Sequence, residues 1–271
     1  MEDLRKLGRL KTRLLQNTLR GLGQQSLLRI SFMGLFAIGF WAGLFWVLFH
    51  AFDFIESCEE LRLQLEEYLF SLFFLSLIVM LLFSNGILAF SALFRSQETT
   101  LLMSYPLRAE AVVGYKFFEV LLFSSWASLV IGAPLMIAYG VKAQAHWTFY
   151  LTSLIFFLTF IFLPAVLGML WAMLINAVFP GLRRPVVVAF GLLGLLATAF
   201  FATRLFGPAE SLPPTTLWIG RVLDKVSFCQ HPLLPSYWMS KGVLGVSQGN
   251  WSGVTFFYLT LLSNVLFGLL L

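Results

Sequence analysis

Six long apolar runs, almost free of charged residues, limit what this chain can fold into. A bilayer core about 30 Å thick is crossed by about 20 apolar residues of helix, at about 1.5 Å each. The runs therefore predict an all-α, polytopic membrane protein whose transmembrane domain is residues 31–271. The six predicted spans are approximately residues 31–50, 69–92, 117–140, 149–177, 186–206 and 253–271.

The composition supports a membrane class and excludes a nucleic-acid partner. Of the 271 residues, 59% are hydrophobic and only 11% are charged, whereas a soluble domain carries roughly 25% charged residues. The formal charge of +5 comes from basic residues that flank apolar runs and do not cluster with exposed aromatic residues. The expected partner of this surface is the lipid bilayer. No cleavable signal peptide is evident, and the first run is typical of a retained anchor.

The segment before the first span, residues 1–30, has the pattern of a basic amphipathic helix. At 100° per residue its leucines share one half of a helical wheel and most of its basic residues share the other, which suits a helix lying on an anionic leaflet. A disordered basic tail remains the alternative. The residues predicted to face the membrane surface are Arg5, Lys6, Arg9, Arg13 and Arg20.

The basic residues also predict the orientation of the spans. Twelve Lys and Arg residues lie in the amino-terminal segment and in the loops after the second and fourth runs, against six on the other side. Short loops rich in Lys and Arg stay in the cytoplasm. We therefore expect a multi-pass protein of the cell (inner) membrane with a cytoplasmic amino terminus, and with the long segment 207–252 outside.

A search for catalytic and metal-binding patterns finds none. The three histidines, His50, His146 and His231, have no partners at metal-ligand spacing, and no H-E-x-x-H or G-x-S-x-G segment occurs. No G-x-x-x-x-G-K-[ST] phosphate loop occurs either. We therefore predict no catalytic residue, no metal and no cofactor in this chain. Cys58 and Cys229 fall on the same predicted side and are either paired or unrelated thiols.

Polar residues within the spans are few. Glu119 lies at the edge of the third span, where it either sits at headgroup level or serves a proton relay. Asn85 and Asn176 are typical of hydrogen bonds between helices. Gly39 and Gly43 form a G-x-x-x-G that permits close helix contact, within the chain or with a subunit. The last span ends at Leu271, which is the pattern expected of part of a longer protein.

The predicted cytoplasmic loop 94–116 carries the most specific pattern. Ser96 can cap a short helix and Glu98 lies in its first turn, where the helix dipole favours a negative charge. Pro106 biases Tyr105 away from helical geometry. Leu101, Leu102 and Met103 form an apolar knob suited to a groove on a soluble partner. An interfacial helix on the inner leaflet is the alternative.

This layout resembles the membrane subunit of ABC-2 type exporters, possibly an amino-terminal half from a bacterial subfamily. The stretch from Phe94 through Glu98, Leu101, Leu102, Pro106 and Leu107 is similar to the coupling loops of that family, Gly114–Glu119 to the entry of its third span, and Leu234–Trp238 to its outer proline-tryptophan segment. The resemblance implies a permease subunit of an ATP-driven exporter without its own ATPase. It also implies a separate ABC-type ATPase that holds ATP and Mg²⁺, and a second permease unit. The residues implied to contact the ATPase are Glu98, Leu101, Leu102, Met103, Tyr105, Pro106 and Leu107.

Three alternatives remain beside this interpretation. An ion-coupled secondary transporter or channel would need buried charges and paired broken helices. A membrane-embedded enzyme would need titratable groups that converge at one depth. A non-catalytic assembly or immunity factor is the third.

Overall fold

The computed structural model describes residues 27–58, 61–105, 108–178 and 226–270, with isolated positions between 191 and 223. These residues are helical, and no strand occurs among them. The elements are α2 (Leu27–Ser57), α3 (Arg62–Phe90), the π-helical turn η2 (Ser91–Arg95), α4 (Gln97–Ser104), α5 (Ala109–Lys142), α6 (Trp147–Val178), the 3₁₀ turn η3 (Ser227–Gln230), α9 (Pro235–Ser247) and α10 (Trp251–Leu270).

Five of these helices, α2, α3, α5, α6 and α10, are long and apolar enough to cross a membrane. The predicted all-α membrane class is confirmed. The fifth predicted run, 186–206, falls mainly outside the described residues, and so does the amphipathic helix predicted for residues 1–30. The basic residues of that helix that cannot be placed are Arg5, Lys6, Arg9, Arg13 and Arg20.

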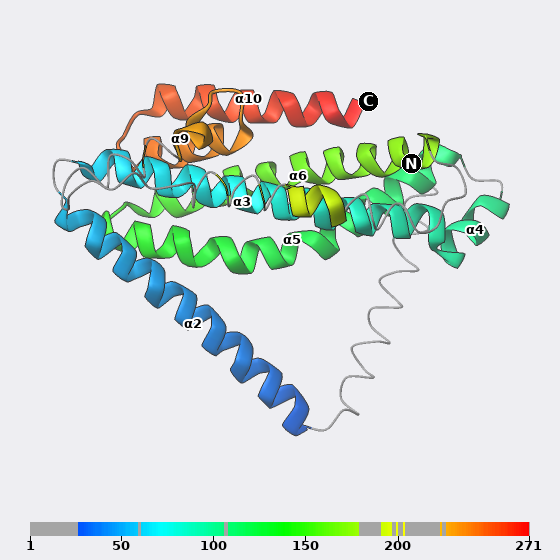
Figure 1. The fold of residues 1–271 in the computed structure, drawn as a ribbon, viewed down its shortest axis with the longest axis horizontal. Coiled ribbons are helices and arrows are strands. Elements are labelled where there is room, and N and C mark those ends of the chain that lie inside the picture. The colour runs from blue at the N-terminus through cyan, green and yellow to red at the C-terminus, as the bar shows by residue number, and fades with distance from the viewer. Residues whose placement is uncertain are drawn as a thin grey trace.

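Helix α6 is the centre of the bundle. Within its most apolar window 61% of residues are buried, against 6% in α2. The α3 and α6 pair makes the most extensive contact, and α5, α9 and α10 also pack on α6. Figure 1 shows α3, α5, α6 and α10 running roughly side by side, while α2 leaves the bundle obliquely from one end. We call the two ends of the bundle the α4 end and the α9 end.

The helices extend beyond the apolar runs because charged residues at their ends are paired. The α3 helix begins at Arg62, whose Nε donates to Glu66 Oε1 at 3.0 Å, one turn on. The α5 helix begins at Ala109, with Glu110 in its first turn and Lys142 in its last, where the helix dipole favours each charge. Both helices are therefore longer than the apolar runs that predicted them.

A tight turn joins α9 to α10 and positions both against the bundle. Gly249 has φ +70°, a conformation that glycine adopts without the steric cost of a side chain. The side-chain oxygen of Asn250 accepts a hydrogen bond from the Gly253 N–H at 3.2 Å, which caps the start of α10. Pro235 occupies the first turn of α9, where its missing N–H costs nothing.

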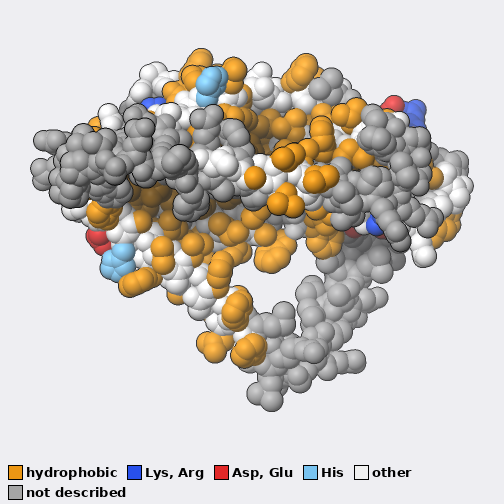
Figure 2. Space-filling model, in the orientation of Figure 1, with side chains coloured by type: hydrophobic (Ala, Val, Ile, Leu, Met, Phe, Trp, Pro, Cys, Tyr) orange, Lys and Arg blue, Asp and Glu red, His pale blue; other side chains and the backbone are white. Residues whose placement is uncertain are grey.

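The surface of the bundle is mainly apolar. On the face in Figure 2, hydrophobic side chains cover the middle of the molecule, and the visible charged side chains lie toward the two ends. Exposed residues such as Phe36, Leu122 and Leu158 contribute to this band. A band of this kind fits a protein whose long helices cross a bilayer.

Candidate functional site

The α4 end is built by a break in α3. The last turn of α3 widens into the π-helical turn η2, and Ser96 follows with an extended backbone (φ −78°, ψ 126°) before α4 begins. Ser96 occupies the N-cap position, but its side chain makes no capping hydrogen bond. Its carbonyl instead accepts from the Thr100 N–H at 3.3 Å. A π-helical turn often marks a functional position.

Helix α4 is short and ends where proline requires it. Tyr105 has an extended backbone (φ −84°, ψ 157°), which is the conformation expected of a residue before proline. Pro106 and Leu107, two of the predicted coupling residues, lie outside the described residues. Thr99 holds α4 against η2, because its buried hydroxyl donates to the Ala92 carbonyl at 2.6 Å.

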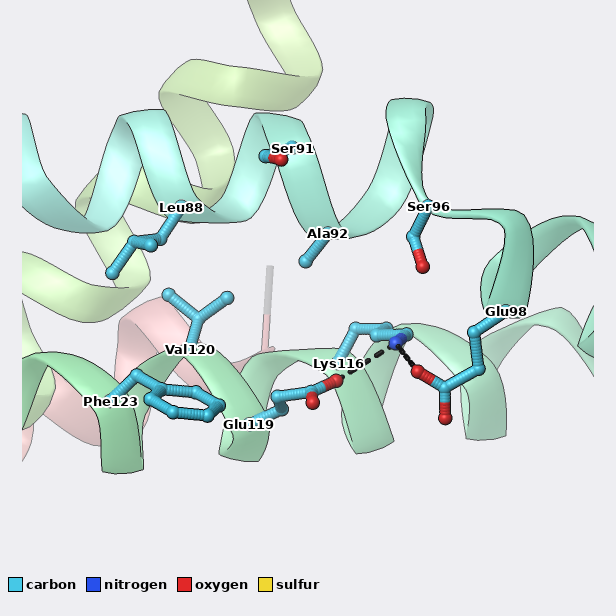
Figure 3. A pocket seen from close by; sticks show the side chains of 9 residues that line it. All are labelled: Leu88, Ser91, Ala92, Ser96, Glu98, Lys116, Glu119, Val120 and Phe123. Carbon is cyan, nitrogen blue, oxygen red and sulfur yellow. Dashed lines mark hydrogen bonds and ion pairs between the residues drawn. The ribbon is translucent and has the colours of Figure 1, made fainter. Parts of the chain in front are cut away.

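A buried lysine joins α4 to α5. Lys116 Nζ lies 2.6 Å from Glu98 Oε2 on α4 and 2.8 Å from Glu119 Oε2 on its own helix, and Figure 3 shows both carboxylates converging on it. The side chain of Lys116 is 2% exposed, that of Glu119 18% and that of Glu98 52%. The Tyr115 hydroxyl donates to Glu98 Oε1 at 3.3 Å. Because a buried charge must be paired, these contacts are required by the position of Lys116.

A pocket of about 360 Å³ surrounds this cluster. Its two ends differ in character: Figure 3 shows Leu88, Val120 and Phe123 at one end, and Glu98 and Lys116 at the other. Its lining residues are Leu88, Ser91, Ala92, Ser96, Glu98, Lys116, Glu119, Val120 and Phe123. The arrangement suits a joint between two helices better than a reaction site, since both acids are engaged by one base.

Three apolar side chains in and just after α4 are exposed. Leu101 is 62% exposed, Met103 54% and Tyr105 63%, whereas Leu102 is half-buried. Of the predicted coupling residues, the structure thus leaves three apolar side chains exposed, although residues two apart on a helix do not share one face. Glu98 lies on the side that faces α5. The pairing of Lys116 was missed, because sequence alone counts it only as a loop cation; the three-residue spacing of Lys116 and Glu119 was the available signal.

A second polar group, also missed from the sequence, lies at the α9 end. Glu66 is buried, and the Tyr139 hydroxyl lies 3.4 Å from its Oε2 and 2.8 Å from Ser247 Oγ. Lys241 Nζ of α9 lies 2.6 Å from Glu67 Oε1 of α3. Glu66 and Glu67 precede the predicted span 69–92, and the structure places both in the second turn of α3.

The remaining polar candidates make bonds within their own helix or a pair between α2 and α5. Asn85 donates to the Leu81 carbonyl of its own helix at 2.8 Å, and within the described residues its buried side-chain oxygen accepts no hydrogen bond from another helix. His50 Nδ1 lies 3.3 Å from Asp53 Oδ2, and Asp53 also pairs with Lys142. Across the described ranges, no three histidine, cysteine or acidic side chains gather to form a metal site. Both cysteines are free thiols.

Comparison with known proteins places the chain in a family. Residues 22–271 match a family model described as "Putative ATP-binding cassette", which covers most of the chain. No curated protein matches, and no solved structure matches.

This match corrects three sequence-based predictions. The sequence predicted an ABC-2 type permease, the function of a permease subunit, and the lack of an ATPase in this chain. The matched family is described as an ATP-binding cassette, which contradicts all three predictions. The assignment depended on short degenerate motifs, which recur wherever an interfacial helix follows a span. The search for G-x-x-x-x-G-K-[ST] tests one phosphate cradle only, so its absence could not exclude ATPase activity. An ion-coupled transporter fits the match no better.

Proposed function

We propose that this chain is a membrane-spanning component of an ATP-driven transport system, because it belongs to the family described as "Putative ATP-binding cassette". Five helices long and apolar enough to cross a bilayer support the membrane role. The short helix α4, which projects at one end of the bundle (Figure 1), supports a contact with the machinery that hydrolyses ATP.

The exposed apolar side chains at α4 carry this proposal. Leu101 and Met103 on this helix of eight residues, and Tyr105 directly after it, are each more than half exposed, while Thr99 and Glu98 hold the helix against the bundle. A small apolar knob on a fixed helix suits a groove on a soluble partner. The partner we propose is an ABC-type ATPase polypeptide, in which ATP and Mg²⁺ are the cofactors.

The location follows from the same geometry. An ATP-hydrolysing partner works in the cytoplasm, so we propose that the α4 end and the amino terminus face the cytoplasm and that the membrane is the cell (inner) membrane. The excess of Lys and Arg in the segments on this side supports the orientation.

A second membrane unit is the other proposed partner. In the described part of α2, Phe32, Leu35 and Phe36 are each about 70% exposed, and a Cβ added at Gly39 or Gly43 would meet no atom of this chain within 4 Å. Small residues on an apolar helix permit close contact with another helix. A second copy of the chain packed on α2 would use this surface.

A purification experiment tests the α4 contact. The wild-type chain, the variant Leu101→Asp/Met103→Asp and the control Leu233→Asp are purified from native membranes in mild detergent, and co-purifying proteins are identified by mass spectrometry. Leu233 is a matched control because it is also an exposed leucine but lies at the α9 end. ATP hydrolysis is measured on each preparation.

The proposal expects an ATP-hydrolysing polypeptide with wild type and with Leu233→Asp, and its loss with the α4 variant. Recovery of that polypeptide with all three preparations would contradict α4 as the contact. Hydrolysis by the purified chain, with no second polypeptide present, would place the ATP site in this chain and overturn the proposed partner.

A further inference from the structure

Lys116 is the more deeply buried of the two buried charged side chains in the described part of the chain, the other being Glu66. An ammonium in this position needs at least one carboxylate to offset the loss of hydration. Lys116 has two, and they come from different elements. Glu119 lies one turn along α5, whereas Glu98 lies on α4.

These two carboxylates differ in how far they can move. Glu119 remains beside Lys116 in any position of α4, because both belong to one continuous helix (Ala109–Lys142). Glu98 is half exposed and belongs to a short helix that packs chiefly on η2 and α5. If α4 leaves the bundle, Glu98 leaves with it, and Lys116 keeps Glu119 as its counterion.

The two carboxylates also oppose each other. Both bring an oxygen within 2.8 Å of the same ammonium nitrogen, so their like charges repel at short range. Glu119 therefore weakens the attraction of Lys116 for Glu98. It also lowers the free-energy cost of the detached state, because Lys116 keeps a counterion when Glu98 leaves.

We propose that Lys116 is a positioning residue with two pairing states, which makes α4 a detachable element. In the attached state Lys116 is shared between Glu98 and Glu119, as Figure 3 shows. In the detached state Lys116 pairs with Glu119 alone, and α4 is free to move with its partner. The use of such a detachable helix rests on the proposed function of α4 as a contact for an ATPase. The two pairing states themselves involve contacts within this chain only.

The two acids must therefore act in opposite directions. Glu98→Gln weakens the attached state and leaves Lys116 paired, so α4 detaches more often. Glu119→Gln removes the alternative partner, so detachment would leave a buried cation unpaired and α4 detaches less often. A purely structural role would instead loosen α4 in both variants.

Hydrogen exchange on the purified full-length chain in lipid nanodiscs tests this. Amide exchange within α4 is compared for wild type, Glu98→Gln, Glu119→Gln and the control Glu110→Gln. Glu110 is an exposed acid in the first turn of α5 outside the Lys116 cluster. Exchange in α3 and α6 reports whether each variant is folded.

We expect α4 amides to exchange about tenfold faster in Glu98→Gln, since local opening responds directly to the lost contact. We expect slower exchange than wild type in Glu119→Gln and no change in Glu110→Gln. Combining Lys116→Met with Glu98→Gln should add nothing to Lys116→Met alone, because both remove the same contact, and Lys116→Arg should restore slow exchange.

Faster exchange in both Glu98→Gln and Glu119→Gln would overturn the two-state pairing, and so would unchanged exchange in both. Since no ATPase takes part in this measurement, its failure would leave the α4 contact of the preceding section intact. Equally, a failed co-purification would leave the pairing states of Lys116 standing.

Discussion

Tyr139 of α5 and Ser247 of α9 share a hydrogen bond of 2.8 Å, at the end of the bundle opposite to α4. It is one of three polar links that hold α9. Ser71 and Ser240 share a second, at 2.8 Å, and Lys241 pairs with Glu67. Helix α9 is thus tied to both α3 and α5, the two long helices that also flank α4.

The first prediction concerns the Tyr139 hydroxyl. Tyr139→Phe keeps the ring, which packs on Phe52, Phe70 and Phe149, and removes only the bonds to Ser247 and Glu66. Because buried polar groups would lose their partner, we expect the free energy of unfolding in detergent to fall by about 1 kcal/mol. Hydrogen exchange in α9 should rise at the same time.

Tyr150→Phe is the matched control. Tyr150 is partly exposed, and its hydroxyl makes no hydrogen bond in the described part of the chain. Its removal should leave the unfolding midpoint unchanged. Equal effects of the two substitutions would show that Tyr139 contributes only its ring.

The sequence was sufficient to predict an all-helical chain whose long apolar helices could cross a membrane, because a run of about 20 apolar residues is typical of such a helix. It could not locate their ends. Arg62, Glu66 and Lys116 are charged, so a count of apolar residues stops before them, whereas in the structure each is paired and the helix continues.

The candidate site was only partly accessible from the sequence. The α4 helix, Glu98 in its first turn and the stop before Pro106 follow from local rules on caps and proline. The bond from Glu98 to Lys116 joins residues 18 positions apart and depends on how the turn η2 folds α4 back on α5. No local pattern specifies that fold.

The second prediction concerns a close approach of α3 and α6. A Cβ at Gly168 would lie 2.8 Å from the Gly86 backbone nitrogen and from Asn85 Cβ, so the two helices would have to separate. We expect Gly168→Ala to lower the free energy of unfolding by about 1–3 kcal/mol, as overpacked cores do. Thermal unfolding in detergent measures it.

Gly114→Ala provides the opposite case. A Cβ at Gly114 meets nothing within 4 Å, and alanine is the better helix former by about 1 kcal/mol. Gly114→Ala should therefore be neutral or stabilising. If Gly168→Ala were equally harmless, the close crossing of α3 and α6 would be wrong.

The third prediction concerns the two cysteines, whose pairing the sequence left open. Cys229 is fully buried in η3, and burial raises the pKa of its thiol to about 11. Cys58 is only partly buried. Since the thiolate is the reactive form, the folded chain should take up one maleimide at pH 7.5, on Cys58, and a second only after denaturation in SDS.

The rate at which maleimide labels Cys229 should increase with pH. At pH 7.5 the Cys229 thiol lies well below its pKa and is almost wholly protonated, so labelling should increase only as the pH approaches 11. Cys58→Ser should abolish labelling of the folded chain at pH 7.5, and Cys229→Ser should leave it unchanged. Rapid labelling of Cys229 at pH 7.5 would mean that η3 opens readily from α3. Loss of both free thiols under mild oxidation would mean that the two cysteines come together, contrary to the structure.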